Sequence, residues 1–244
     1  MDPVLTVLSN SFAPYWWCWL LTPVIAYLLG SINPAVIVTK IWTKGKKDIR
    51  EMGSGNAGFT NVLRSVGKAP AIITIVCDAL KCVIAVLIGG MLFSLVTGSE
   101  TDPIYKEMVI NVGKYLAGIF CILGHSYPLY FHFKGGKGVV SAAALMLTED
   151  WRVFLMVLGT FLILFLLFKI ISLGSITGAL LYGPYTFLAT FFFDRIPYGD
   201  NIVMSYVVVS TCAALIIGVF VTVKHKDNIK RLLRGEEKKI TAKK

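Results

Sequence analysis

The first long stretch of the chain, residues 3–39, contains no charged side chain. Such a stretch is long enough to cross the hydrocarbon core of a bilayer, which takes about 20 apolar residues. Further apolar stretches follow, so that 56% of the 244 residues are hydrophobic and only 16% are charged. A soluble domain carries about 25% charged residues. The sequence therefore predicts an all-α polytopic membrane protein.

Seven spans account for the apolar stretches, at about residues 16–39, 69–96, 110–131, 139–147, 153–168, 171–193 and 202–223. The fourth is short, because a helix rising ~1.5 Å per residue over residues 138–147 covers only about half of a bilayer core. It is counted as a crossing helix because the strongly basic tail, residues 224–244, would otherwise end outside the cell. Merging or splitting the spans around Lys169 would change this count. We expect one membrane domain over residues 1–244.

The distribution of charge sets the expected orientation. The net charge is +10, and a short loop after the first span carries Lys40, Lys44, Lys46, Lys47 and Arg50. Such an excess marks the cytoplasmic side and places the N-terminus outside. Residues 98–108 then form a mildly acidic outer loop. Because the basic residues lie beside apolar spans and no nucleic-acid-binding motif is present, nucleic acid is not an expected partner.

The first polar loop, residues 53–64, is rich in glycine and in hydroxyl and amide side chains. Glycines let a backbone aim several N–H groups at one point, and the N-terminus of a following helix adds to such an anion site. We expect Thr60 or Asn61 to cap that helix. The glycine spacing also matches the dinucleotide pattern, but no strand precedes it, and the plainer alternative is a flexible turn. The candidate phosphate-binding residues are Gly53, Ser54, Gly55, Asn56, Gly58, Thr60, Asn61 and Arg64.

A second glycine-lysine loop, residues 133–138, precedes the short fourth span. Its lysines supply point charges for a phosphate, and its glycines allow close approach of the backbone to a ligand. The alternative is a positive-inside anchor. Two such loops on the cytoplasmic face predict two phosphate-bearing ligands, or one ligand with two phosphates. The candidate residues are Lys134, Gly135, Gly136, Lys137 and Gly138.

Polar side chains also lie at the ends of the spans. Asp78 and Lys81 are three residues apart on the second span and are expected to pair, in a structural or a supporting role. His125, near the end of the third span, is either a substrate contact or a satisfied interfacial residue.

At the start of the tail, His225, Asn228 and Arg231 recur every three residues. They share one face if the last helix continues past Val223. The alternative is a polybasic segment that binds anionic lipid, which the lysines near the C-terminus fit well.

Several kinds of chemistry are not indicated. The five cysteines lie in apolar stretches and form no Cys-x-x-Cys pair, so neither a disulfide framework nor a metal site is expected. No carboxylate pair is spaced for acid–base work, and no Gly-x-Ser-x-Gly sequence suggests a hydrolase. The histidine and aspartate separated by four residues that mark acyltransferases using acyl thioesters are absent as well.

Three blocks of the sequence together resemble the bacterial acyl-phosphate:glycerol-3-phosphate acyltransferases, integral enzymes of phospholipid synthesis. They occur in the family's order and spread over most of the chain. The first runs from Gly30 through Asp48-Ile49-Arg50 and the first polar loop to Lys68, the second from Gly124 to Val139, and the third from His225 to Glu237. The departures are minor: Phe59 and Cys82 stand where small residues are expected.

The resemblance implies a reaction and its setting. The hydroxyl on carbon 1 of glycerol-3-phosphate attacks the acyl carbonyl of an acyl phosphate, giving 1-acyl-glycerol-3-phosphate (a lysophosphatidic acid) and phosphate. It implies seven spans, with the three blocks on the cytoplasmic face of the bacterial plasma membrane. We expect a monomer among membrane lipids that uses no metal or cofactor.

The resemblance also implies roles for residues. The catalytic set is Ser54, Arg64, Lys137, His225 and Asn228. The substrate-binding set is Arg50, Gly53, Gly55, Asn56, Gly58, Thr60, Asn61, His125, Lys134, Gly135, Gly136, Gly138 and Arg231.

An acyl phosphate is already activated, so the protein need only hold two anions together and stabilise the developing charge. We therefore expect a substrate phosphate, whose second pKa is near 6, to accept the hydroxyl proton. His125 or His225 as general base is the alternative. A ~10³-fold loss of turnover on changing either histidine to glutamine, with substrate affinity unchanged, would favour it.

Two other functions remain as alternatives to this reading. An anion transporter places its site near the membrane midplane in repeated halves, whereas here the polar blocks lie at one face and no repeat is visible. An acyltransferase that uses acyl thioesters differs from the expected enzyme only in its donor.

Overall fold

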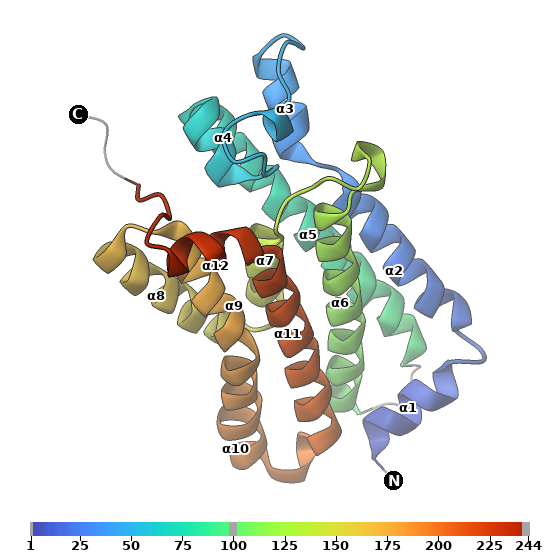
Figure 1. Cartoon of the computed structure of the whole chain (residues 1–244). Helices are drawn as coiled ribbons and strands as arrows, with labels where there is room; N and C mark the ends of the chain where they lie inside the picture. The colour runs from blue at the N-terminus through green and yellow to red at the C-terminus, as the bar shows by residue number, and fades with distance from the viewer. Residues whose placement is uncertain (1, 98–101, 241–244) are drawn as a thin grey trace. The chain divides into compact units, whose positions relative to one another are not determined.

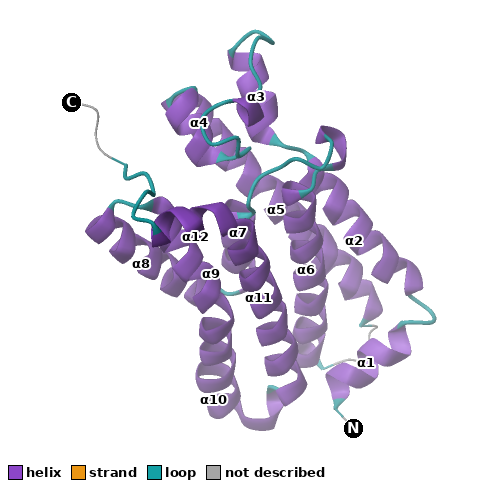
Figure 2. Cartoon of the chain, viewed as in Figure 1, coloured by secondary structure: helices purple, strands orange, loops and turns teal. Residues whose placement is uncertain are grey.

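The computed structural model describes residues 2–97 and 102–240. Within these residues every regular element is a helix, and turns and loops join the helices (Figure 1, Figure 2). The predicted all-α class is therefore confirmed. By internal contacts the described chain divides into two compact units, one of residues 6–148 and one of residues 149–240 with residues 2–5. A single functional domain over residues 1–244 stays a prediction.

The larger unit contains the first two glycine-rich blocks. Its elements follow α1 (Pro3–Ser11) and are α2 (Trp16–Ser31), α3 (Pro34–Trp42), η1 (Ile49–Glu51), α4 (Phe59–Ser65), α5 (Lys68–Val96), α6 (Pro103–Ser126), η2 (Leu129–Phe131) and α7 (Val139–Glu149). Figure 1 shows α3, α4 and the turn after α6 at the same end of the long helices α2, α5 and α6. This end of the unit carries both polar loops.

The smaller unit contains the third block. Its elements are α8 (Trp151–Phe168), α9 (Ile171–Phe187), the π-helix η3 (Leu188–Arg195), α10 (Ile196–Tyr198), η4 (Gly199–Asn201), α11 (Met204–Lys224) and α12 (Lys226–Leu233). The described tail then runs to residue 240, and the predicted basic residues Lys243 and Lys244 lie outside the described residues.

Six helical stretches of the described residues are long and apolar enough to cross a membrane: Trp16–Trp42, Lys68–Val96, Pro103–Phe131, Trp151–Phe168, Ile171–Tyr198 and Met204–Lys224. They match six of the seven predicted spans. The remaining one, α7, has only 11 residues. Its crossing stays a prediction, and so do the count of seven and the orientation.

One predicted boundary was wrong. The third span begins at Pro103, inside the expected outer loop of residues 98–108, because Asp102 caps the helix by accepting a hydrogen bond from the Ile104 N–H at 2.8 Å. Glu100 of that loop lies outside the described residues. The first predicted span, residues 16–39, forms as two helices, α2 and α3, with a break between Ser31 and Pro34 in the polar sequence of residues 30–34.

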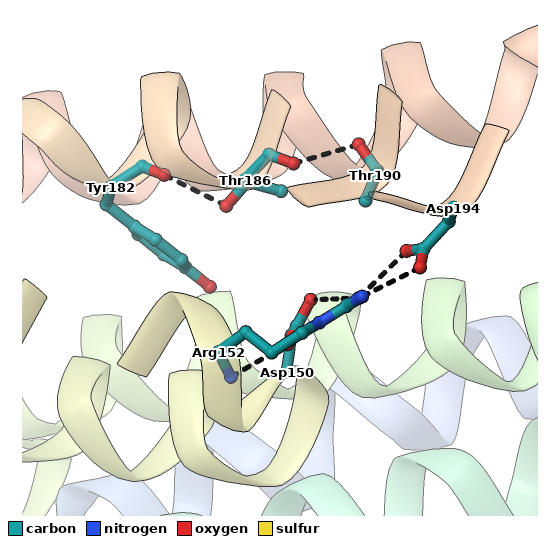
Figure 3. A network of polar contacts seen from close by, with 6 residues as sticks. All are labelled: Asp150, Arg152, Tyr182, Thr186, Thr190 and Asp194. Carbon is teal, nitrogen blue, oxygen red and sulfur yellow. Dashed lines mark hydrogen bonds and ion pairs between the residues drawn. The ribbon is translucent and has the colours of Figure 1, made fainter. Parts of the chain in front are cut away.

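A network of polar contacts ties α8 to η3 in the smaller unit (Figure 3). The Arg152 guanidinium bonds both oxygens of Asp194, each at 2.8 Å, and reaches Asp150 at 2.7 Å. On α9 and η3, the hydroxyls of Thr186 and Thr190 donate to backbone carbonyls four residues earlier, so their polar groups are satisfied within the helix. None of these residues was predicted to belong to the site.

Candidate active site

The first polar loop closes on the amide of Asn61. This side chain is only 3% exposed, so its polar atoms need partners inside the protein. Its Oδ1 accepts from the Ser54 N–H at 3.1 Å, and its Nδ2 donates to the carbonyls of Ile49 at 3.0 Å and Met52 at 2.9 Å. One amide thereby bonds three backbone groups and fixes the shape of the loop.

The turn in this loop needs glycine. Gly53 and Gly55 have φ values of 57° and 71°, in the left-handed region that only glycine adopts without strain. A Cβ on Gly53 would also overlap Asn61 Oδ1. The N-cap of α4 is Gly58, with no side-chain hydrogen bond, so the prediction that Thr60 or Asn61 caps this helix is wrong. The helix begins at Phe59, which places both residues within its first turn.

Arg50 joins the two loops. Its guanidinium makes a two-pronged ion pair with Asp48, at 3.0 and 2.7 Å, and Nη1 donates to the Phe131 carbonyl at 2.8 Å. The hydrogen bond from Arg50 holds the pKa of the Asp48 carboxyl below its usual range. Because Phe131 ends η2, just before the second loop, the guanidinium fixes the distance between the loops.

The second loop lies directly on His125. The Gly136 N–H donates to the His125 carbonyl at 3.1 Å. A Cβ on Gly136 would overlap His125 Nε2 and lie 2.7 Å from the Ala57 carbonyl, and one on Gly135 would overlap the His125 carbonyl. The glycine pair therefore lets the second loop pack closely on its own chain, and the contact of these glycines with a ligand stays a prediction. Gly138, with φ 82°, turns the chain into α7.

His125 is buried, at 4% exposure. Its Nδ1 lies 3.1 Å from Asp78 Oδ1 and 3.0 Å from Lys81 Nζ. The predicted pairing of Asp78 with Lys81 is confirmed, with a separation of 2.9 Å. The ring of His125 is thus held from within the helices.

The candidate cations and the serine lie at the surface of the loops. The side chains of Ser54, Arg64 and Lys134 are exposed, and Lys137 is half-buried. Asn56 and Thr60 are also half-buried. A soluble anion can therefore reach these groups from the loop end of the larger unit.

The third block has a different geometry from the one expected. Helix α11 ends at Lys224, and α12 starts afresh at Lys226, so the last helix does not continue past Val223 as one rod. His225 stands at the break, 3% exposed, with Nδ1 2.7 Å from the Val221 carbonyl. His225 is the N-cap residue of α12, and Asn228 and Arg231 lie three residues apart within that helix.

Glu237 organises this block. Its Oε1 accepts from Asn228 Nδ2 at 2.7 Å and from the Ser172 hydroxyl at 2.8 Å, and its Oε2 accepts from Arg231 Nε at 2.7 Å. The carboxylate therefore folds the tail back onto α12 and onto the start of α9. We had not predicted Glu237 or Ser172 as site residues; the glutamate's place at the end of the third block was the available signal.

The structure brings the two loops and His125 together in the larger unit. His225, Asn228 and Arg231 lie in the smaller unit, and their approach to the loops stays a prediction. Among the described residues, no group of three or more histidine, cysteine or acidic side chains is placed to hold a metal ion.

We expect the Glu237→Gln variant to lose about 1–3 kcal/mol of stability at neutral pH, because three hydrogen bonds to a carboxylate are weakened. Burial raises the pKa of Glu237, but the hydrogen bonds from Ser172, Arg231 and Asn228 outweigh it and lower that pKa. The stabilisation is therefore full above the unfolded value of about 4.3 and is lost as pH falls through the folded value.

Thermal unfolding in detergent at pH 7 and at stepwise lower pH measures this effect. The difference in Tm between wild type and Glu237→Gln should be largest at pH 7 and should shrink in acid. The Glu236→Gln variant changes the exposed neighbouring glutamate. It is the matched control and should shift Tm little. A difference in Tm that does not change with pH would contradict the stabilising role of the Glu237 carboxylate.

A comparison with known families decides what kind of protein carries this site. The model of the family described as "Glycerol-3-phosphate acyltransferase" matches residues 20–235. The chain belongs to the glycerol-3-phosphate acyltransferase family. It is an acyltransferase, as the resemblance predicted. The matched region contains the first two blocks and the third from His225 to Gly235.

Relatives and solved structures agree with this family. The glycerol-3-phosphate acyltransferases of Methylococcus capsulatus and Thermoanaerobacter pseudethanolicus are 38% and 37% identical, over 92% and 90% of this chain and 97% and 94% of theirs. Two crystal structures of PlsY (YgiH), an integral membrane glycerol 3-phosphate acyltransferase, are also similar. Its glycerol 3-phosphate form has a TM-score of 0.66 at 32% identity, and its lysophosphatidic acid form 0.67 at 33%; each alignment covers 91% of this chain and 95% of the other.

Proposed function

We propose that this acyltransferase transfers the acyl group of an acyl phosphate to the 1-hydroxyl of glycerol-3-phosphate. The products are 1-acyl-glycerol-3-phosphate and inorganic phosphate. The solved neighbour has a glycerol 3-phosphate form and a lysophosphatidic acid form, which are the acceptor and the product of such a transfer. The enzyme acts as a monomer in the bacterial plasma membrane, with the site on the cytoplasmic face and seven spans.

The observation that carries this proposal is the joining of two glycine loops, each with at least one accessible cation, in one compact unit. Arg50 links the loops through the Phe131 carbonyl, and Gly136 fits between His125 and Ala57. Two substrates that each bear a phosphate need two anion sites held close together. The pair of loops therefore fits two phosphate-bearing substrates better than it fits a single anion.

Four exposed or half-buried side chains take the roles of phosphate ligands. Arg64 and Lys137 clamp phosphate oxygens, Lys134 adds charge, and Ser54 donates a hydrogen bond. His225 and Asn228 orient a substrate from the smaller unit. Asn61 and Arg50 contribute through the loop shape that they hold, and the backbone of Gly53, Gly55 and Gly58 lines the first loop.

The chemistry follows from the donor. Acyl phosphate is a mixed anhydride, so the acyl carbon needs no enzyme nucleophile. As the hydroxyl oxygen bonds to the acyl carbon, the bond from that carbon to the bridging oxygen breaks and phosphate leaves. A phosphate oxygen accepts the hydroxyl proton, while the cations stabilise the charge that develops.

A donor comparison tests the proposed function. The purified protein in lipid vesicles, given glycerol-3-phosphate, should form lysophosphatidic acid with a synthetic acyl phosphate and not with acyl-CoA of the same chain length. Product formed with acyl-CoA but not with acyl phosphate would contradict the assignment of the donor. Counterflow of labelled glycerol-3-phosphate in sealed vesicles, without product, would point to a transporter.

A further inference from the structure

The most buried charged group of the larger unit lies beneath the two loops. Asp78, Lys81 and His125 are 1%, 6% and 4% exposed, respectively. Charged groups in membrane helices are costly, so their retention in this place calls for a function. None of the three faces the surface of the loops, where the phosphate ligands lie.

Lys81 fills a gap in the backbone hydrogen bonding between α2 and α3. The helical partner of the Gly30 carbonyl would be the N–H of Pro34, which proline lacks. The helical partner of the Ile32 carbonyl would be the Val36 N–H, which instead donates to the Asn33 side chain at 3.2 Å. Both carbonyls accept from Lys81 Nζ, at 3.0 and 2.6 Å. The ammonium thus replaces two missing backbone donors.

This break leads to the first loop. Helix α3 starts at Pro34 and leads through Asp48 and Arg50 to the loop of residues 53–58. The direction in which α3 leaves the break therefore decides where the first loop stands. Lys81, on α5, fixes that direction by binding the carbonyls of Gly30 and Ile32 at the break.

The same ammonium reaches the second loop. Lys81 Nζ lies 2.9 Å from Asp78 Oδ1 and 3.0 Å from His125 Nδ1. The His125 carbonyl holds the Gly136 N–H, and its ring lies against Gly136. A chain of direct contacts therefore runs from Lys81 to both loops.

We propose that Lys81 is a positioning residue for acyl transfer, which holds the two glycine loops in register through the α2–α3 break and through His125. The inference rests on the proposed function for its kinetic test. Removing Lys81 lets the loops shift relative to each other, and a displacement of about 1 Å at a reacting centre can cost 10²-fold in rate.

The test uses the double variant Asp78→Asn/Lys81→Met beside Lys81→Met. Lys81→Met alone leaves a buried charge and can fail to fold, whereas the double variant removes both charges together. We expect the folded double variant to show KM values about tenfold higher for both substrates and kcat/KM about 10²-fold lower. Loss of folded enzyme alone lowers the maximal rate and leaves KM unchanged.

Hydrogen exchange provides a second readout that does not depend on activity. Peptides covering residues 48–58 and 133–138 should exchange about tenfold faster in the double variant, and peptides of α8 and α9 should not change. The matched control is Arg152→Met/Asp194→Asn, which removes the ion pair of the smaller unit and should keep both KM values within about twofold.

Either unchanged KM values or unchanged exchange of the loop peptides in Asp78→Asn/Lys81→Met would overturn the positioning role. An equal rise of KM in the control variant would overturn it as well. If the wild type transfers no acyl group from acyl phosphate, the proposed function fails, and the exchange measurement alone decides the role of Lys81.

Discussion

The Gly136→Ala variant is expected to lose about 10²-fold or more of its acyl transfer activity. The added methyl group would overlap His125 Nε2 and lie 2.7 Å from the Ala57 carbonyl. Neither neighbour can yield easily, because Asp78 and Lys81 hold the histidine and Ala57 is buried in the first loop. The second loop must therefore move, and overpacking of this kind costs about 1–3 kcal/mol.

The matched control is Gly159→Ala on α8, where nothing lies within 4 Å of the added methyl group. Alanine in a helix is more favourable than glycine by about 0.5–1 kcal/mol, so this variant should keep wild-type activity and unfold no earlier. Initial rates and thermal unfolding of the two variants in the same detergent make the comparison. Full activity in Gly136→Ala would mean that the two loops need not meet at this point.

Arg64→Ala should lower kcat/KM by about 10²–10³-fold, because a guanidinium that clamps a phosphate stabilises charge in the transition state. Arg64 lies on α4 with an exposed side chain, so its removal should cost little stability. Arg64→Lys should recover only part of the loss, because an ammonium cannot make the two-pronged contact.

Lys46→Ala is the control for lost charge. Lys46 is an exposed cation of the loop after α3 and belongs to neither glycine loop. It should change kcat/KM by no more than about twofold, since surface charges act weakly at a distance. An equal loss in Lys46→Ala and Arg64→Ala would assign the effect to the general field of the basic face.

The helices were largely predictable, because apolar runs of bilayer length leave few choices. The break before Pro34 was also predictable from a polar sequence with proline. The start of α6 was not, because Asp102 and Pro103 were interpreted as parts of an acidic loop, although together they form a cap signal.

The site was predictable in its residue types and less so in its contacts. The sequence shows that Asp78 and Lys81 can pair on one helix, but His125 is 47 residues away from Asp78, and only packing of α6 on α5 brings it there. A pair of glycines indicates that the backbone lies close to another group but does not identify that group. Gly135 and Gly136 were therefore predicted to contact a ligand, and their contact with His125 was not predicted. Asn61 was predicted as a phosphate ligand from its place in the loop, and the sequence did not indicate its hydrogen bonds to the backbone of Ile49 and Met52 in an earlier turn.

The most direct measurement follows phosphate release and lysophosphatidic acid together. Purified protein in lipid receives glycerol-3-phosphate and a synthetic acyl phosphate, in the wild type and in Arg64→Ala. We expect equal amounts of the two products from the wild type and almost none from the variant. Phosphate release without lipid product, or no reaction by folded protein, would contradict acyl transfer from acyl phosphate at these loops.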